Sequence, residues 1–462
     1  MASEKKEIER TKKLSIVEGS FSVLQGGFGT SHIVPYALAI GKGNPYTTTF
    51  IGILSSLPSV LGNIAQLFSH GLMKKHSRKN IISLFIFLQS LMWIGIIFAG
   101  TALLFLHLSS TISLTILLLS YSLLIFFGAF AGPPWVSLMK DIVTKERGAY
   151  FGKRNAITGA ISLATFVIGG LIINRIQEPY VLYGFFIFFT IAMIGRSISA
   201  YLFSKHYSPK LEIEDGLYFN FFQFAKKMLF NNFGRFTVFV ALFALARAIA
   251  SPFFSVYMLN NLKFSYLQWT FVTFSAALAS LIFVPMWGRF SDKYGNIKMM
   301  KITGIITPTL PVLWIFSMPL LNSYGASTTF VLLCFFELFS GAIWAGFNLA
   351  TSNFIYDAVT RQRTAICYAY HSLIASIGAF IGATIGGFIS SRDIFFFGYG
   401  PLVLVFTISA VARAIVYFTM IRRVKEVREV EAFDWSKNLK ESVTPLTNKK
   451  LLDMFATKHL HK

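Results

Sequence analysis

The sequence predicts an all-α polytopic membrane protein with about twelve transmembrane helices, which form two six-helix repeats and leave both termini in the cytoplasm. The chain of 462 residues is 54% hydrophobic and only 13% charged, about half the charged fraction of a soluble domain. Apolar segments of about 20 or more residues recur along it, each long enough to cross a bilayer as a helix. Nothing alternates with a two-residue period over long blocks, which argues against a membrane β-barrel.

An internal repeat is the second observation behind this fold class. An offset of 217 residues places Gly71 on Gly288 and Arg196 on Arg413. Each repeat holds six expected spans, which is an even number, so the two copies have the same orientation in the membrane.

The distribution of charge is the third observation. Most of the 42 lysines and arginines fall in the loops on one side of the expected spans and in the two termini. The other side carries few of them: Lys42, Arg175, Lys263 and Arg392. This bias is the positive-inside signature of cytoplasmic loops, and it predicts a multi-pass protein of the plasma membrane. It also explains the net charge of +22 without nucleic-acid binding.

The apolar runs divide the chain into five regions. These are the N-terminus 1–15, a first six-helix bundle 16–204, a cytoplasmic linker 205–234, a second six-helix bundle 235–421 and a basic cytoplasmic tail 422–462. The expected spans are 16–40, 47–70, 80–105, 112–139, 154–175, 180–204, 235–259, 267–289, 298–321, 327–356, 366–390 and 396–421. Aromatic and lysine residues of the linker predict a helix that lies on the membrane surface.

Two features within the spans predict local geometry. Pro35 and its repeat mate Pro252 each remove a backbone hydrogen bond, so a bend is expected there, either as an outer gate or as a static kink. Gly378, Gly382 and Gly386 lie four residues apart and predict a close packing seam, which we expect between the two repeats.

One loop motif links the chain to a known family. The loop after the eighth span fits the pattern G-x-x-x-D-[RK]-x-G through Gly288, Asp292, Lys293 and Gly295. Together with twelve spans in two repeats and a long middle loop, it makes residues 16–421 resemble the major facilitator superfamily. The sequence departs from the family at Asn296, where an arginine or lysine is usual.

The resemblance implies a secondary transporter that works by alternating access, with a small-molecule substrate, no cofactor and a cavity lined by helices 1, 4, 7 and 10. It also implies that Asp292 contacts the start of helix 5, around Lys153 and Arg154, and so holds the cytoplasmic side closed. The alternative is a solvated loop held by its glycine turns. The first-half copy of the motif keeps Gly71 but has Lys75 where the aspartate belongs.

Repeated charges at the cytoplasmic ends of the spans predict structural contacts. Asp141 and Arg147 in the first half match Asp357 and Arg363 in the second, and we expect each pair to act at the loop it flanks.

Three further charges lie near the cytoplasmic ends of spans. The matched residues Arg196 and Arg413 can reach the headgroups or a loop carboxylate from there, and we expect a structural role because both halves keep them at the same place. Glu18, at the start of the first span, is interpreted as interacting with a helix N-terminus.

Two ionisable residues lie near the middle of spans and have no counterpart in the other half. The offset places Thr30 opposite Arg247 and Ser120 opposite Glu337. A charge at mid-membrane costs roughly 2.5–3.5 kcal/mol and usually faces a cavity or a partner. We expect an ion pair between Arg247 and Glu337, for which substrate or a proton competes; the alternative is a fixed structural pair.

Other polar and aromatic residues of the spans are weaker candidates for the cavity, and each alone is equally explained by packing. They are Gln25, His32, Tyr121, Trp344 and Asn348.

Competing functions have less support from the sequence. No HExxH, G-x-S-x-G or P-loop motif is present, which argues against a membrane-embedded enzyme. A transporter-like receptor or lipid-handling protein without solute flux stays open. Cys334 and Cys367 lie in or beside apolar runs and are expected to be packing residues, with no metal site. We expect membrane lipids as partners and a monomer as the working unit.

Overall fold

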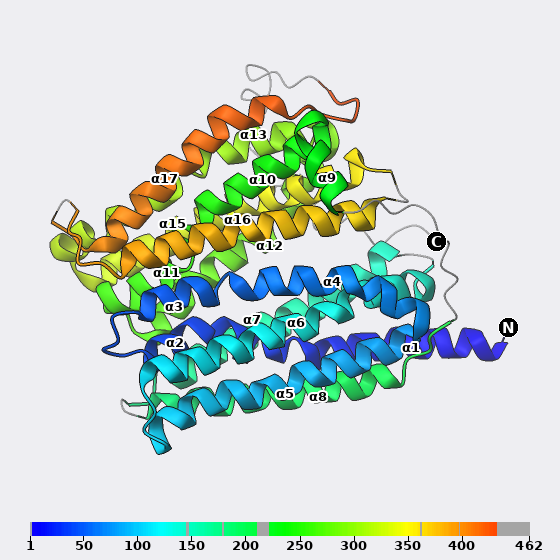
Figure 1. The fold of residues 1–462 in the computed structure, drawn as a ribbon, viewed down its shortest axis with the longest axis horizontal. Coiled ribbons are helices and arrows are strands. Elements are labelled where there is room, and N and C mark those ends of the chain that lie inside the picture. Colours follow the sequence, from blue (N-terminus) through cyan, green and yellow to red (C-terminus); the bar gives the residue numbers. More distant parts are fainter. Residues whose placement is uncertain are drawn as a thin grey trace, which may run out of the picture.

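The computed structural model describes residues 2–144, 147–177, 180–209, 221–360, 363–396 and 398–431. Within them the chain is helical apart from turns and an isolated bridge between Phe396 and Tyr399. The helices form two bundles, one from α1 to α8 and one from α9 to α17, packed against each other as two layers (Figure 1). The predicted all-α fold of two helical repeats is thereby confirmed.

The first half contains eight α-helices and two short irregular helices. They are α1 (Ala2–Ser22), the π-helix η1 (Gln25–Gly29), the 3-10 helix η2 (Thr30–His32), α2 (Ile33–Ile40), α3 (Thr47–Leu54), α4 (Leu57–Lys75), α5 (Arg78–Phe105), α6 (Ser110–Ile142), α7 (Arg147–Ile173) and α8 (Val181–Ser204).

The second half has the same general plan. Its helices are α9 (Phe221–Lys227), η3 (Met228–Phe230), α10 (Asn232–Ala248), α11 (Phe253–Val256), the π-helix η4 (Tyr257–Asn261), α12 (Tyr266–Tyr294), α13 (Asn296–Ile306), α14 (Thr309–Ile315), α15 (Ser317–Ala358), α16 (Thr364–Ser390), α17 (Pro401–Met420) and η5 (Ile421–Arg423).

Ten segments of the described chain are long and apolar enough to cross a membrane. The expected spans 16–40 and 298–321 are not in that set. The first is divided at η1 and η2, and the second between α13 and α14. α15 in turn joins two expected spans across Gly325, whose φ of 79° interrupts the helix. The breaks in the first and seventh spans lie just before Pro35 and Pro252, which lack the amide hydrogen that would continue the helix.

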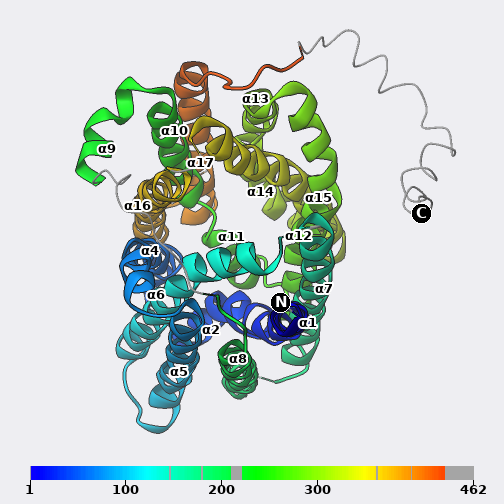
Figure 2. The same cartoon turned by 90° about the vertical axis from the view of Figure 1, so that its right-hand side faces the viewer.

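The two halves contact each other along α3 and α4 with α16, and along α7 with α12 (Figure 2). The hydroxyl of Thr49 donates to the carbonyl of Gly387 at 3.2 Å, and the amide of Asn63 donates to the carbonyl of Ser372 at 3.0 Å. The α7–α12 contact lies at the end of the bundle opposite the N-terminus, where the backbone amide of Leu267 donates to the side chain of Asn174. We call the end that carries the N-terminus the basic end.

The glycine stripe of α16 does not pack between the halves, so that expectation was wrong. Cβ atoms at Gly378, Gly382 and Gly386 would lie 2.0–2.3 Å from backbone carbonyl oxygens of the α10 segment, which belongs to the same half. The absence of side chains lets the two helices of one bundle approach closely. The stripe therefore builds the second half.

We predict that Gly382→Ala destabilises the protein by about 1–3 kcal/mol, because its Cβ would overlap the Leu245 carbonyl oxygen and force the helices apart. Thermal unfolding of the detergent-purified protein measures this. Gly159→Ala in α7 is the matched control, since no atom lies within 4 Å of its Cβ position. Equal unfolding temperatures for the two variants would contradict the prediction.

Candidate substrate cavity

A cavity of about 480 Å³ lies inside the second half, between α10, α12, α14, α15 and α17. It brings together the two mid-span charges and both of the expected second-half contacts: Arg247, Glu337, Trp344 and Asn348. A second cavity of about 330 Å³ adjoins it at Arg247 and is lined by residues of both halves. Arg247 thus stands where the interior of the second half meets the space between the halves.

Arg247 is the penultimate residue of α10, which ends at Ala248. The C-terminal end of a helix carries partial negative charge and favours a cation. The guanidinium carbon lies 4.3 Å from the centre of the Trp344 ring, close enough for a cation–π interaction. Its side chain is exposed to the cavity and forms no ion pair with a carboxylate among the described residues.

Glu337 lies on α15 and faces the same cavity. Its carboxylate accepts a hydrogen bond of 3.1 Å from the indole nitrogen of Trp314, and the cation that interacts with it electrostatically is Arg413. The expected direct ion pair between Arg247 and Glu337 is not formed in the part of the chain that the structure describes. The two charges share a cavity but have different partners.

Arg413 is only 2% exposed, so the expectation that it reaches the headgroups was wrong. Its Nη1 donates to the carbonyl of Thr307 at 3.1 Å. A continuous helix would pair that carbonyl with residue 311, but Pro311 has no amide hydrogen to donate. At the break between α13 and α14 the carbonyl accepts only a long backbone bond of 3.4 Å from the amide of Leu310, and Arg413 adds a shorter one. The sequence signal for this contact was the proline four residues after Thr307.

Arg196, the repeat mate of Arg413, is likewise turned into its own half. Its Nε donates to the side-chain oxygen of Gln89 at 2.7 Å, and its Nη1 donates to the hydroxyl of Ser22. Both halves therefore use an arginine on their last long helix as an internal donor.

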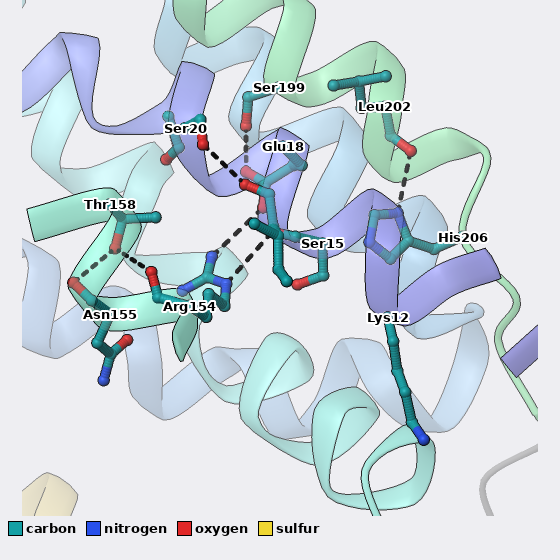
Figure 3. Close-up of polar contacts among 12 residues, drawn as sticks. Lys12, Ser15, Glu18, Ser20, Arg154, Asn155, Thr158, Ser199, Leu202 and His206 are labelled. Atoms are coloured by element: carbon teal, nitrogen blue, oxygen red, sulfur yellow. Dashed lines mark hydrogen bonds and ion pairs between the residues drawn. The ribbon is translucent and has the colours of Figure 1, made fainter. Parts of the chain in front are cut away.

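Glu18 is buried between α1, α7 and α8, as Figure 3 shows. It accepts a hydrogen bond of 2.6 Å from Ser199 and forms an ion pair of 3.5 Å with Arg154. Because α1 begins at Ala2, Glu18 is far from the helix N-terminus, and that interpretation was wrong. His206 follows α8 directly and is drawn with Glu18 in Figure 3. Burial lowers the pKa of its imidazole, so the ring is neutral at neutral pH.

The loop motif has a different set of contacts from those expected. Asp292 is exposed and has no ion pair with Arg154 among the described residues. Gly295, with φ at 90°, makes the turn into α13, and a Cβ there would lie 2.5 Å from the carboxylate of Glu426. Gly288 lies within α12, with only one side-chain atom as near as 4.0 Å to its Cβ position. That Asp292 closes the basic end stays a prediction.

The chain segment after η5 supplies the cation that the motif lacks at Asn296. The amide of Asn296 donates to Asp357 at 2.6 Å, and Arg428 forms an ion pair with the same carboxylate at 3.0 Å. Lys293 pairs with Glu431 at 3.7 Å. Residues 424–431 thus contact the ends of α12, α13 and α15, and we call them the strap.

The first half satisfies the matching carboxylate from within its own bundle. Asp141 forms an ion pair with Arg78 at 2.6 Å, at the start of α5. The side chain of Arg147 lies outside the described residues, and Arg363 is exposed at the start of α16. The structural roles expected of Arg147 and Arg363 stay predictions.

Three candidates of the first half line neither cavity. Gln25 begins the π-helix η1, and Tyr121 packs against the hydrophobic core of α5, α6 and α8. His32 is fully buried among aromatic rings, with centroids of Phe188 and Trp269 at 5.3 and 5.8 Å. Their roles in binding stay predictions. No group of three or more His, Cys, Asp or Glu side chains that could hold a metal ion occurs among the described residues.

We predict that Arg428→Gln weakens the attachment of the strap by up to about 1 kcal/mol, a modest value because the ion pair is partly exposed. Limited proteolysis should cut within residues 424–431 faster than in the unchanged protein. Lys425→Gln removes a neighbouring charge whose side chain forms no ion pair with a described residue, and should leave cleavage unchanged. Equal cleavage in Arg428→Gln would show that the ion pair does not hold the strap.

The comparisons with known proteins agree with this architecture. The profile of the family described as Major Facilitator Superfamily matches residues 19–233 and 236–457. No curated protein matches the sequence.

Solved structures resemble the whole fold. An inward-facing bacterial homologue of the iron transporter ferroportin is 13% identical, with a TM-score of 0.68 over 89% of this chain and 98% of the other. A D-xylose–proton symporter is 10% identical and has a TM-score of 0.65 over 91% of this chain and 99% of the other. An outward-facing structure of a bacterial ferroportin homologue is 14% identical and has a TM-score of 0.55 over 89% of this chain and 99% of the other.

Proposed function

We propose, since this chain belongs to the major facilitator superfamily, that it is a secondary transporter which moves a small solute by alternating access between its two halves. The observation that carries this proposal is the charge pattern of the second-half cavity. Arg247 is exposed there beside an aromatic ring, while Glu337 and Arg413 already interact with each other. The cavity therefore contains one cation without an acidic partner among the described residues.

The chemistry of that cation favours an anionic or zwitterionic substrate. A guanidinium presents two parallel donors that match a carboxylate or phosphate, and the Trp344 ring leaves one face of Arg247 for contact with the cavity. The indole of Trp344 also offers an apolar surface to the rest of the molecule. Asn348, exposed on the same wall, adds a polar contact.

Glu337 is the residue through which we expect proton coupling. It lies within the helical bundle, where an ionised carboxylate is costly, and its support comes from Trp314 and Arg413. An anion bound at Arg247 would also interact with the positive charge of Arg413 and would repel the ionised carboxylate of Glu337. Substrate binding would then favour the protonated form of Glu337, which links the substrate to a proton.

We place the basic end at the cytoplasm of the plasma membrane and count twelve spans, since the two divided segments each complete a crossing. The positive-inside bias supports this orientation. The structure then corresponds to an inward-facing state: the likeness to the inward-facing ferroportin homologue is greater than to the outward-facing one. The chain would work as a monomer surrounded by lipid.

Closure of the cytoplasmic side would bring Asp292 of α12 to the start of α7, near Lys153 and Arg154. α7 and α12 already touch at their far ends, so a rocking motion about that contact would join their cytoplasmic ends. In the present structure Arg154 is held by Glu18 instead. Arg154 would thus exchange one carboxylate for another during the cycle.

The first test of the function is binding. A panel of small carboxylates, phosphates and amino acids is screened by thermal shift on the purified protein. For a compound that stabilises it, Arg247→Gln should weaken binding by about 2 kcal/mol, or roughly 30-fold. Arg392→Gln at the opposite end is the matched control. Unchanged binding in Arg247→Gln would remove this residue from the site.

The second test is transport of that compound into proteoliposomes. Uptake should respond to an imposed pH gradient, and Glu337→Gln should keep binding but lose the response, because the amide cannot exchange a proton. A gradient response that survives in Glu337→Gln would exclude it as the coupling group. Binding without uptake under any gradient would favour a receptor without solute flux.

The third test concerns the gate. On a background without Cys334 and Cys367, a cysteine at Ser251 in the cavity reports access from the cytoplasm by its rate of thiol labelling. Asp292→Asn should raise that rate several-fold, because the closed state loses its contact, while Asp393→Asn should not. An unchanged labelling rate in Asp292→Asn would show that Asp292 does not hold the cytoplasmic side closed.

A further inference from the structure

A third cavity, of about 730 Å³, lies at the basic end and is separate from the substrate cavity. It is bounded by α9, by the start of α10 and by the turn between α15 and α16. Its polar lining comes from Gln223, Lys227, Asn231, Thr360 and Arg363. No acidic residue lines it among the residues described, so an anion could enter without repulsion.

The two cations of this cavity are available to a ligand. Lys227 and Arg363 are both exposed, and neither forms an ion pair with a carboxylate in the described ranges. Arg363 directly precedes α16, where the helix dipole gives a cation no stabilisation. Lys227 ends α9 and Arg363 precedes α16, so the two cations come to this cavity from different elements.

The surroundings of the cavity are apolar, which a water-soluble anion would not require. Phe224, Phe233 and Cys367 form its inner wall. Beside it, Phe222 and Phe230 are 78% and 82% exposed. Aromatic side chains exposed next to membrane helices are typical of the interface between headgroups and acyl chains.

The position of α9 agrees with a location at the interface between headgroups and acyl chains. Figure 2 shows it outside the ring of long helices, beside α10 and α16. It lies at the same end as the N-terminus (Figure 1), which the proposed orientation places at the cytoplasmic leaflet. α9 also belongs to the connection between the two halves, so a ligand held here would fix that connection to the second half.

We propose that this cavity binds the headgroup of an anionic phospholipid from the cytoplasmic leaflet. Lys227 and Arg363 contact the phosphate, Arg363 through its planar pair of donors. Thr360 offers a polar contact to the rest of the headgroup, while Asn231 caps α10 and donates to the carbonyl of Lys227. The acyl chains run along the exposed rings of Phe222 and Phe230. The site rests on the proposed orientation, but it does not depend on the substrate or on transport.

Native mass spectrometry of the full-length protein in detergent tests the site, with dioleoyl phosphatidylserine and dioleoyl phosphatidylcholine as probes. The unchanged protein should retain one phosphatidylserine more tightly than any phosphatidylcholine. Lys227→Gln combined with Arg363→Gln should weaken the binding of phosphatidylserine on the order of tenfold or more, since each basic residue near a headgroup contributes to binding. Thermal unfolding without lipid confirms that the variant is folded.

A charge-matched control separates a site from general attraction. Lys226→Gln combined with Lys425→Gln removes two exposed cations at the same end that do not line the cavity, and it should keep the tight phosphatidylserine. An equal loss in both double variants would overturn the site in favour of unspecific attraction. Displacement of the lipid by inorganic phosphate alone would overturn the role of the acyl chains. Transport assays are not involved, so failure here leaves the proposed function intact.

Discussion

The contact between Arg413 and the carbonyl of Thr307 is the constraint on which the second half depends. Pro311 cannot donate to that carbonyl, which accepts a long backbone bond of 3.4 Å from the amide of Leu310. Arg413 supplies a second, shorter bond and thereby places a fixed positive charge near Glu337. Glu337 accepts its hydrogen bond from Trp314, and Arg247 faces the cavity beside Trp344. The three charges of this cavity therefore have different partners.

The two halves differ in how their charged side chains are paired. In the first half Arg196 donates to Gln89 and Ser22, and the buried carboxylate of Glu18 pairs with Arg154. The cavity that holds Arg247 and Glu337 lies instead in the second half. The repeat thus keeps one scaffold while the charged groups differ, which concentrates the candidate binding chemistry in the second half.

At the basic end, matching carboxylates of the two halves pair with different parts of the chain. Asp141 lies near the end of α6 and Asp357 near the end of α15. Arg78 at the start of α5 pairs with the first, whereas Arg428 of the strap pairs with the second. The sequence did not reveal either partner, since spacing along the chain does not show which distant segment folds back.

The sequence by itself determined the helical membrane fold, the two repeats and the family, because span length, charge bias and the loop motif are local and repeated. It also named Arg247, Glu337, Trp344 and Asn348 as candidates, since charges and polar groups within an apolar run stand out, and the four line one cavity. Only the tertiary structure decided their partners. Ion pairs and packing seams depend on which helix faces which, and helix breaks change that by exposing backbone groups. The glycine stripe, Glu18 and Arg413 were misplaced for this reason.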